Sequence, residues 1–380
     1  MPRVTYNTII QISDEADVDA IIRYAGISSF RKSKHSPFIF ADCVHPEILS
    51  DCPGVESVNT EKKYSPLLVH SLALTNTYKA KIKGFTGAGV NVAVIDTGCD
   101  TTDDIFWRDA PGGGRECIVA GKVSVGAIAG DLSYESVDET GHGTLVCGIV
   151  AGVAPGCNIY SLDVKFMEAG VSTAYTSDFD VLYSWICDHP ELNIEVVNLS
   201  WGVDPAVEHQ TVYNGDALSG IVNWYFDTYG IHTIVASGND GFRQGVGAPA
   251  CATRAIAVGA TYSAYWGALG LDKAADTAEP VNSVQISTRP MQITRFSNTG
   301  GLVQLLAPGA VITAGGVTAS GTSMAAPHVV GAIAVLKGKN PTLSILDCVD
   351  ILKNTGTPVT LETPVTVYTI PHIDLDEATA

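Results

Sequence analysis

The sequence lacks the segments that mark membrane and secreted proteins. No apolar run reaches the roughly 18 residues that a membrane-spanning helix requires. The N-terminal stretch MPRVTYNTII contains no basic region followed by an apolar segment and a small-residue cleavage site, so it does not resemble a secretory signal. We therefore expect no membrane partner and an intracellular location.

Positive charge and paired cysteines are also scarce. The chain has 22 lysine and arginine residues against 40 aspartate and glutamate residues, which gives a formal net charge of -18. A surface that binds nucleic-acid phosphates needs clustered basic side chains, so this balance argues against a nucleic-acid partner. The nine cysteines are an odd number and include no CxxC pair, which argues against a disulfide scaffold or a zinc cluster and favours a reducing compartment.

The composition instead indicates a compact globular chain with a small N-terminal domain. Hydrophobic residues make up 46% of the 380 positions and charged residues 16%. Residues 1–64 combine strand-like stretches with a helical pattern, in which apolar residues recur from Val18 to Ala25 and Ser13 is the expected N-cap. This pattern predicts a small α+β domain over residues 1–64 and a second domain over residues 65–380.

Apolar stretches of strand length alternate with helical stretches in the larger part of the chain. Five of them have the pattern of strands buried on both faces of a parallel sheet: residues 90–98, 158–164, 194–200, 232–237 and 254–260. The segments between them have the length and composition of helices. The sequence therefore predicts an α/β fold, a doubly wound and mainly parallel sheet flanked by helices, whose functional site lies outside the carboxyl ends of the strands.

Four polar residues stand at the expected ends of strands and starts of helices. Asp96 ends the strand VNVAVID, Asn239 follows another strand in ASGND, and His142 lies between glycines in GHGT. Ser323, in GTSMAAP, begins a long apolar helix, where free backbone N–H groups favour a developing negative charge. Taken singly, the aspartate and the histidine are explained as turn residues and the serine as a helix cap, but their order along the chain is specific.

The chain resembles the subtilisin-like serine proteases. Successive blocks between residues 90 and 331 are similar to signature segments of that family: VAVIDTG, GHGTLVCGIVAG, NLSWG, ASGN, FSNTG, LAPG and GTSMAAPHVVG. The resemblance implies hydrolysis of peptide bonds through an acyl-enzyme on Ser323, with His142 as the base and Asp96 orienting the imidazole. It also implies an oxyanion hole formed by Asn239 and the Ser323 N–H, and a reaction that requires no cofactor or metal.

The same resemblance implies where a polypeptide substrate binds. An extended substrate would pair with the edge segment Ser200, Trp201 and Gly202, and Trp201 would wall the pocket for an apolar side chain unless it only packs in the core. The pocket is expected to include four further residues, Ala236, Ser237, Gly238 and Gly247. No acidic residue stands in the GVGAP stretch at the expected pocket floor, so neither trypsin-like nor furin-like specificity is predicted.

The N-terminal domain is similar to the family's inhibitory propeptide, which packs on the protease and assists its folding. PGVESV is the segment of greatest similarity, and processing is expected near Tyr64 or Ser65. The connecting segment NTEKK is shorter than expected for a linker that reaches the cleft, so permanent attachment and a cut elsewhere stay open. The alternative function is a catalytically silent binding protein with a blocked cleft, whereas a general serine esterase would need a GxSxG motif that the chain lacks.

Two segments are longer than compact members of the family require, residues 99–137 and 261–292. The first contains four aspartates whose spacing is not diagnostic of a ligand set, so calcium binding is an open prediction: Asp100, Asp103, Asp104 and Asp109. Cys147 follows His142 on the same expected helix, and we expect it to be an inert buried thiol.

Overall fold

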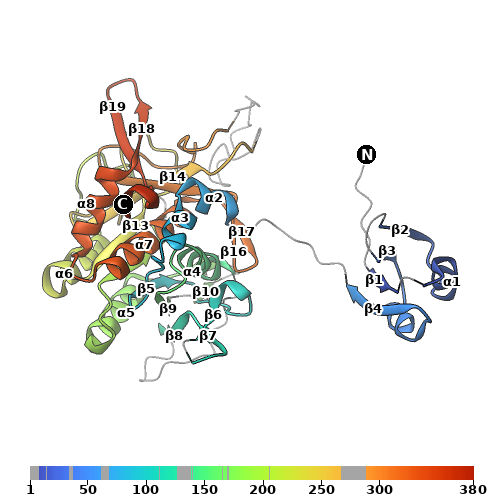
Figure 1. Cartoon of the computed structure of the whole chain (residues 1–380). Helices are drawn as coiled ribbons and strands as arrows, with labels where there is room; N and C mark the ends of the chain where they lie inside the picture. The colour runs from blue at the N-terminus through green and yellow to red at the C-terminus, as the bar shows by residue number, and fades with distance from the viewer. Residues whose placement is uncertain are drawn as a thin grey trace. The chain divides into compact units, whose positions relative to one another are not determined.

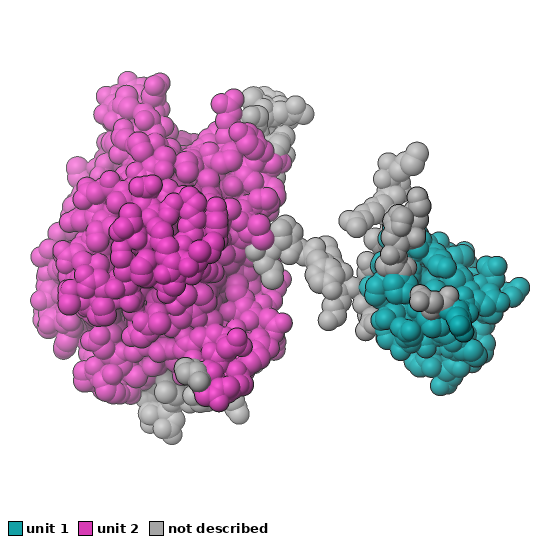
Figure 2. Space-filling view, viewed as in Figure 1, with its two compact units in different colours: residues 1–65 teal, residues 66–380 magenta. Residues whose placement is uncertain are grey.

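The computed structural model divides the chain into two compact units, unit 1 (Met1–Ser65) and unit 2 (Pro66–Ala380), coloured separately in Figure 2. Within them it describes residues 8–13, 15–33, 37–60, 68–110, 112–125, 138, 140–164, 166–168, 171–204, 206–266 and 288–380. The expected processing point at Tyr64 or Ser65 lies outside the described residues.

In its described residues, unit 1 consists of an antiparallel sheet and one α-helix. Its strands lie in the order β2-β3-β1-β4, with bounds β1 Thr8–Ile12, β2 Ser29–Lys32, β3 Phe38–Asp42 and β4 Val55–Thr60. The helix α1 (Val18–Tyr24) and the 3-10 helix η1 (Pro46–Asp51) connect these strands. Ile10 of β1, Ile39 of β3 and Ile21 of α1 are fully buried in one apolar cluster, so the unit has a core of its own.

The N-cap of α1 is Asp17 rather than the expected Ser13. The Asp17 carboxylate accepts a hydrogen bond from the Ala20 N–H at 3.1 Å, as a residue directly before the first helical position can do. The Ser13 N–H instead donates to the Gly54 carbonyl at 2.9 Å. The helix therefore begins at Val18, four residues later than an N-cap at Ser13 would place its start.

Unit 2 is built on a nine-stranded sheet (Figure 1) in the order β18-β19-β15-β14-β13-β12-β5-β9-β8. The strands are β5 Asn91–Asp96, β8 Val119–Ser124, β9 Asn158–Asp163, β12 Val196–Leu199, β13 His232–Ala236, β14 Ala255–Tyr262, β15 Val303–Ala310, β18 Thr357–Glu362 and β19 Val367–His372. All neighbouring pairs from β19 to β8 are parallel, and only β18 runs antiparallel to its neighbour.

Helices cover both faces of this sheet. They are α2 Val69–Leu74, α3 Thr77–Ile82, α4 His142–Val153, α5 Thr176–Asp188, α6 Ala217–Tyr229, α7 Thr322–Lys339, α8 Ile345–Thr355 and α9 Leu375–Ala378. Successive residues of a strand point to opposite faces, and accordingly Val92 and Val94 of β5 pack with α4 and α7, whereas Ala93 and Ile95 pack with α5 and α6. This two-sided packing confirms the predicted doubly wound α/β fold.

Short hairpins and 3-10 helices lie in the loops of unit 2. They are the hairpins β6 Trp107–Asp109 with β7 Arg115–Cys117, β10 Phe166–Glu168 with β11 Val171–Thr173, and β16 Ile312–Ala314 with β17 Val317–Ala319, together with the 3-10 helices η2 Asp104–Phe106 and η4 Pro190–Leu192. None of the helices in the described part of the chain is long and apolar enough to cross a membrane.

The chain order reverses at β5, and this reversal positions the site. The chain leaves β5 for the edge strand β8 and runs through α4 to β9, both on one side of β5, then returns through α5 to β12 on the other side of β5. The loops after β5 and β12 therefore diverge at their carboxyl ends and open a crevice there. Side chains that follow β5, β12 and β13 meet at this edge.

Candidate active site

Asp96 and His142 form a hydrogen-bonded pair at the edge of the sheet. Asp96 is the last residue of β5, and His142 is the first residue of α4. The Nδ1 atom of His142 lies 2.7 Å from Oδ1 of Asp96. The side chain of Asp96 is 1% exposed and that of His142 is 34% exposed. The aspartate is therefore buried, whereas part of the imidazole ring is exposed to solvent.

The charge of Asp96 alters the proton affinity of His142. Burial by itself lowers the pKa of the imidazole, but the charge and hydrogen bond of Asp96, with a further contribution from the charge of Asp138, outweigh it. The net result is a pKa of His142 raised above its ordinary value. The ring is therefore well suited to accept a proton and hold it as an imidazolium.

Asp138 anchors the loop that carries His142, and the sequence reading did not single it out. Its buried carboxylate accepts hydrogen bonds at 2.8 to 3.1 Å from side-chain hydroxyls and backbone N–H groups on both sides of the histidine. The donors are the hydroxyls of Thr97, Thr140 and Thr144 and the N–H groups of Thr140, Gly141 and Thr144. One carboxylate thus ties the residue after Asp96 to the first turn of α4.

These donors keep Asp138 ionised despite its burial. Burial raises the pKa of the carboxyl, and the hydrogen bonds from the threonines lower it by more, so its pKa lies below the ordinary value. Gly143 completes the junction, because a Cβ at this position would collide with the Gly98 carbonyl oxygen. The first turn of α4 can therefore lie directly against the loop that follows Asp96.

Ser323 occupies the first turn of α7 and is held from the side by Ser200. Pro327 has no N–H to donate to the carbonyl four residues earlier, which is that of Ser323. The Ser200 hydroxyl supplies a hydrogen bond to this carbonyl instead, at 3.0 Å, and itself accepts one from the Asn198 side chain at 2.9 Å. The end of β12 thereby fixes the position of Ser323.

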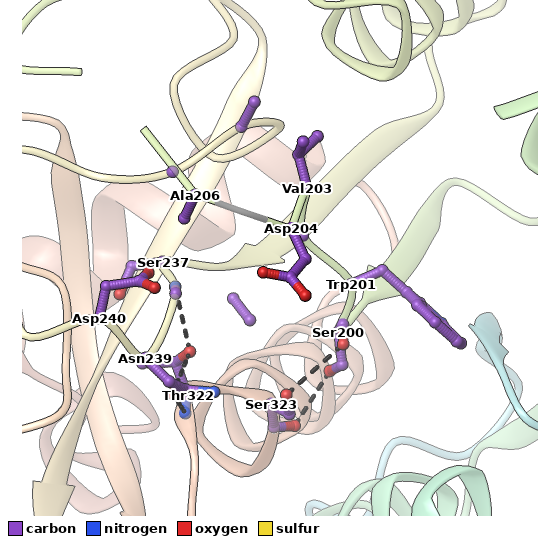
Figure 3. A pocket seen from close by; sticks show the side chains of 15 residues that line it. Ser200, Trp201, Val203, Asp204, Ala206, Ser237, Asn239, Asp240, Thr322 and Ser323 are labelled. Carbon is purple, nitrogen blue, oxygen red and sulfur yellow. Dashed lines mark hydrogen bonds between the residues drawn. The ribbon is translucent and has the colours of Figure 1, made fainter. Parts of the chain in front are cut away.

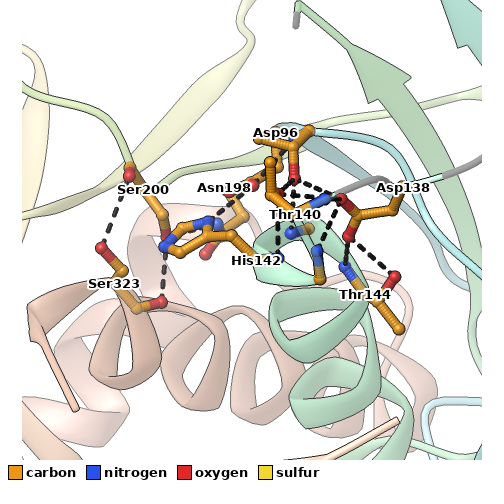
Figure 4. Close-up of polar contacts among 11 residues, drawn as sticks. Asp96, Asp138, Thr140, His142, Thr144, Asn198, Ser200 and Ser323 are labelled. Atoms are coloured by element: carbon orange, nitrogen blue, oxygen red, sulfur yellow. Dashed lines mark hydrogen bonds and ion pairs between the residues drawn. The ribbon is translucent and has the colours of Figure 1, made fainter. Parts of the chain in front are cut away.

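The hydroxyl of Ser323 faces the same edge as the imidazole of His142 (Figure 4). Its Oγ lies 3.5 Å from the Ser200 carbonyl oxygen, a long hydrogen bond, and the described residues show no direct hydrogen bond between Ser323 and His142. Catalytic hydrogen bonds are often long or unformed in a protein without substrate. The structure thus brings Asp96 and His142 into contact and leaves the Ser323 hydroxyl weakly held.

Asn239 is oriented by the helix that carries Ser323. Its Oδ1 accepts hydrogen bonds from the Thr322 N–H at 2.8 Å and from the Thr322 hydroxyl at 3.1 Å. Because a backbone N–H can only donate, this contact fixes which end of the amide is oxygen. The Nδ2 donor makes no hydrogen bond to the described residues, so it is available to an oxygen that arrives beside Ser323.

A pocket opens directly beside Ser323 (Figure 3), between the loops after β12 and β13. Its lining includes all seven residues that the resemblance assigned to substrate binding, Ser200, Trp201, Gly202, Ala236, Ser237, Gly238 and Gly247. The indole of Trp201, however, points away from the pocket in Figure 3 and packs edge-on against Phe179, with ring centroids 6.0 Å apart. The ring of Trp201 thus packs with Phe179 in this structure, although the residue belongs to the lining, and its role in substrate binding stays a prediction.

The pocket also has an acidic character that the sequence reading missed. Asp204 and Asp240 belong to its lining, although the GVGAP stretch, with Gly247, contains no acid. Asp204 follows the edge segment of β12 and Asp240 follows Asn239, so both enter from the walls rather than from the expected floor. In the sequence, only their position next to the motifs assigned to substrate binding and to the oxyanion hole could have indicated that Asp204 and Asp240 line the pocket.

The aspartates of segment 99–137 do not converge in the described residues. Asp103 caps η2 through the Ile105 N–H, Asp104 pairs with Arg115 at 3.0 Å, and the described residues contain no group of three or more histidine, cysteine or carboxylate side chains able to hold a metal ion. Calcium binding stays a prediction, and residues 126–137 lie outside the described part. Cys147 is fully buried as expected, and its contact with the Cys99 thiol together with burial raises its pKa.

Comparisons with known proteins show the family of the chain. Residues 87–368 match the family model described as the subtilase family, Peptidase_S8. The chain is 31% identical over 290 residues to subtilisin Savinase of Lederbergia lenta, which covers 72% of this chain and 86% of that protein. It is 28% identical over 318 residues to the minor extracellular protease Epr of Bacillus subtilis (strain 168), which covers 80% of this chain and only 39% of that longer relative.

The fold has a counterpart among solved structures. The crystal structure of a cold adapted subtilisin-like serine proteinase matches with a TM-score of 0.54 and 26% identity, covering 76% of this chain and 90% of that one. The family match includes the segments that carry Asp96, His142, Asn239 and Ser323. The chain therefore belongs to the subtilase family of serine endopeptidases.

Proposed function

We propose that this chain cleaves polypeptides by acyl transfer to Ser323. The observation that carries the proposal is the Asp96–His142 hydrogen bond of 2.7 Å at the edge where Ser323 begins α7. In the proposed first step, the Ser323 hydroxyl attacks the scissile carbonyl while His142 takes the hydroxyl proton. His142 then gives this proton to the leaving amine, and a water molecule releases the acyl group by the same two transfers.

Asp96 acts in these steps through the imidazole. Its carboxylate accepts a hydrogen bond from the Nδ1–H group, which leaves Nε2 as the basic atom for the serine proton, and its charge stabilises the imidazolium. Asp138 is a positioning residue, since it contacts the loop of His142 and not the reacting atoms. Both carboxylates favour the protonated form of His142.

The proposed oxyanion hole uses the orientation of Asn239. Negative charge develops on the carbonyl oxygen during attack, and the free Nδ2 of Asn239 and the N–H of Ser323 are donors beside this position. Because Thr322 holds the amide before the substrate arrives, the donor needs little reorganisation. This support explains why the sequence places a hydroxyl residue before the nucleophile.

Unit 1 is proposed to act as an inhibitory and folding-assisting propeptide. Support comes from its compactness and its own apolar core, which suit a module able to fold and bind as a unit. The proposed partners are then polypeptide substrates and this unit itself, with cleavage expected near Tyr64 or Ser65. The intracellular location also stays a proposal.

The endopeptidase activity can be tested on a reduced and carboxymethylated protein substrate. We expect the chain to generate new internal peptide ends, identified by mass spectrometry, and the Ser323→Ala and His142→Ala variants to lose at least about 1000-fold in rate. Circular dichroism checks that both variants keep the parent fold. Substrate that stays uncut, or is cut equally by the Ser323→Ala variant, would support the catalytically silent binding protein instead.

A further inference from the structure

The pocket beside Ser323 receives the substrate side chain next to the cleaved bond, if the proposed function holds. Ser323 and Asn239, the nucleophile and the oxyanion donor, both belong to its lining. A carbonyl held by these two residues therefore places the side chain of its own residue at the pocket mouth. The chemistry of the pocket decides which side chain is accepted.

The apolar part of the lining is made of small side chains. Val203, Ala206, Ala236 and Ala248 line the pocket, and its volume is about 200 Å³. Gly247 leaves further room, because a Cβ built there would meet only the Ala206 Cβ at 3.7 Å. With the Trp201 ring turned away, these residues can contact the stem of a long side chain without closing the pocket.

The charged part of the lining has one sign. Asp204 and Asp240 are both exposed, and the pocket lining contains no lysine, arginine or histidine among the described residues. Figure 3 shows the Asp204 carboxylate pointing into the pocket, and it makes no hydrogen bond or ion pair with the described residues. Asp240 is more constrained, since its Oδ2 accepts a hydrogen bond from the Asn298 side chain at 2.9 Å.

We propose that Asp204 makes this pocket selective for a basic side chain, arginine or lysine, directly before the cleaved bond. The aliphatic stem would pack on the alanines, and the cationic head would pair with the Asp204 carboxylate. Asp240 adds a second negative charge at the other wall. An apolar side chain of equal length fills the same space but desolvates the carboxylate without giving it a partner, which is unfavourable.

This proposal replaces the expectation that specificity is not of the trypsin or furin kind. That expectation considered only the GVGAP stretch around Gly247, whereas the acid comes from the loop after β12. A charge-assisted hydrogen bond contributes more than a neutral one and corresponds here to about a 10- to 100-fold preference in kcat/KM. Because Asp204 is exposed, added salt should reduce this preference.

The decisive experiment compares peptide substrates that differ only in charge. Two otherwise identical fluorogenic peptides carry arginine or its neutral isostere citrulline before the cleaved bond, and a third peptide carries leucine. We expect kcat/KM for arginine to exceed that for citrulline by about 10- to 100-fold in the parent chain. In the Asp204→Asn variant this ratio should fall to within a few-fold of one, because kcat/KM for the arginine peptide decreases more than kcat/KM for the citrulline and leucine peptides.

Asp350→Asn is the matched control. Asp350 is an exposed aspartate on α8, 70% exposed at its side chain and outside the pocket lining, so the variant removes the same charge elsewhere. We expect it to keep the parent ratio of arginine to citrulline. A parent ratio near one, or a ratio that survives Asp204→Asn, would overturn the proposal.

A binding measurement separates this proposal from the proposed catalysis. In the Ser323→Ala protein, after removal of unit 1, calorimetry compares the affinities of product peptides that end in arginine or citrulline, with and without Asp204→Asn. The arginine peptide should bind about 10-fold or more tightly, and Asp204→Asn should abolish the difference. Equal affinities for the two peptides would overturn the pocket proposal even if the chain is an active protease. A clear difference in affinity would support the pocket proposal even if no peptide is cleaved.

Discussion

At the scale of single residues, Asp138 affects the proposed base His142 without a hydrogen bond to its ring. Its charge is one of the causes that raise the pKa of His142, and its hydrogen bonds hold the loop on both sides of that residue. Replacing Asp138 with asparagine should therefore lower the pKa of His142. Since His142 acts as a base only when deprotonated, the acid limb of the profile of kcat/KM against pH should move to lower pH.

This shift distinguishes positioning from stability. Asp347→Asn makes the same chemical change at the start of α8, where the carboxylate accepts hydrogen bonds from Ser344 far along the chain from His142. We expect Asp347→Asn to change the unfolding midpoint without moving the acid limb. If Asp138→Asn lowers kcat/KM by the same factor at every pH and leaves the acid limb at the parent pH, the proposed electrostatic effect is contradicted.

The proposed oxyanion hole assigns to Asn239 an effect on the transition state and not on substrate affinity. Because its Nδ2 meets the oxygen only when negative charge develops, Asn239→Ala should reduce kcat by about 100- to 1000-fold and change KM little. This magnitude is carried over from subtilisin itself, where it is known for the loss of such a donor. Steady-state kinetics on one peptide substrate checks it, and a variant affected mainly in KM would show that Asn239 binds the ground state instead.

At the scale of elements, two buried histidines should make the stability of the fold around α7 depend on pH. His328 lies inside α7 and His372 ends β19, and both are fully buried. Burial lowers the pKa of each imidazole to about 4. An unfolded histidine titrates near 6.5, so between about pH 6.5 and pH 4 the unfolded chain binds protons that the folded chain does not.

The free energy of unfolding should therefore fall as the pH decreases through this window, by up to about 3 kcal/mol for each histidine. Urea unfolding of the Ser323→Ala form, followed by tryptophan fluorescence at pH 7 and pH 5, measures the loss. His328→Leu should reduce the difference between the two pH values, whereas His209→Leu, a change at a half-buried histidine, serves as control. If His328→Leu leaves the acid sensitivity unchanged, titration of this residue does not cause it.

At the scale of the whole molecule, the parallel sheet explains how much the sequence could predict. Asp96, Asn239 and Ser323 follow recognisable strands or begin a helix, and the carboxyl ends of parallel strands meet at one edge, so the pattern predicted where the site lies. Their assignment to one site came from the resemblance to the family's motifs. Asp138 was not predicted as a site residue because it lies in a loop before α4, where no periodicity indicates a buried carboxylate. Nor does any pattern fix the direction of a ring, and the turn of Trp201 away from the pocket depended on its packing with Phe179.

The two-unit organisation leads to a prediction about processing. The parent chain should lose about its first 64 residues after expression, and the Ser323→Ala chain should keep them, as measured by intact mass. Adding a small amount of processed parent to the Ser323→Ala chain then shows whether the cut can also be made by another molecule. Identical masses with unit 1 retained in both chains would contradict self-processing, and the endopeptidase tests would still stand on their own.

The central claim is that Ser323 is a nucleophile activated by His142. Labelling the chain, after removal of unit 1, with a serine-directed fluorophosphonate and mapping the modified peptide tests it most directly. We predict a single label on Ser323, strong reduction of labelling in His142→Ala, and none in Ser323→Ala. Absence of any label, or a label on another serine that persists in the Ser323→Ala chain, would contradict the account.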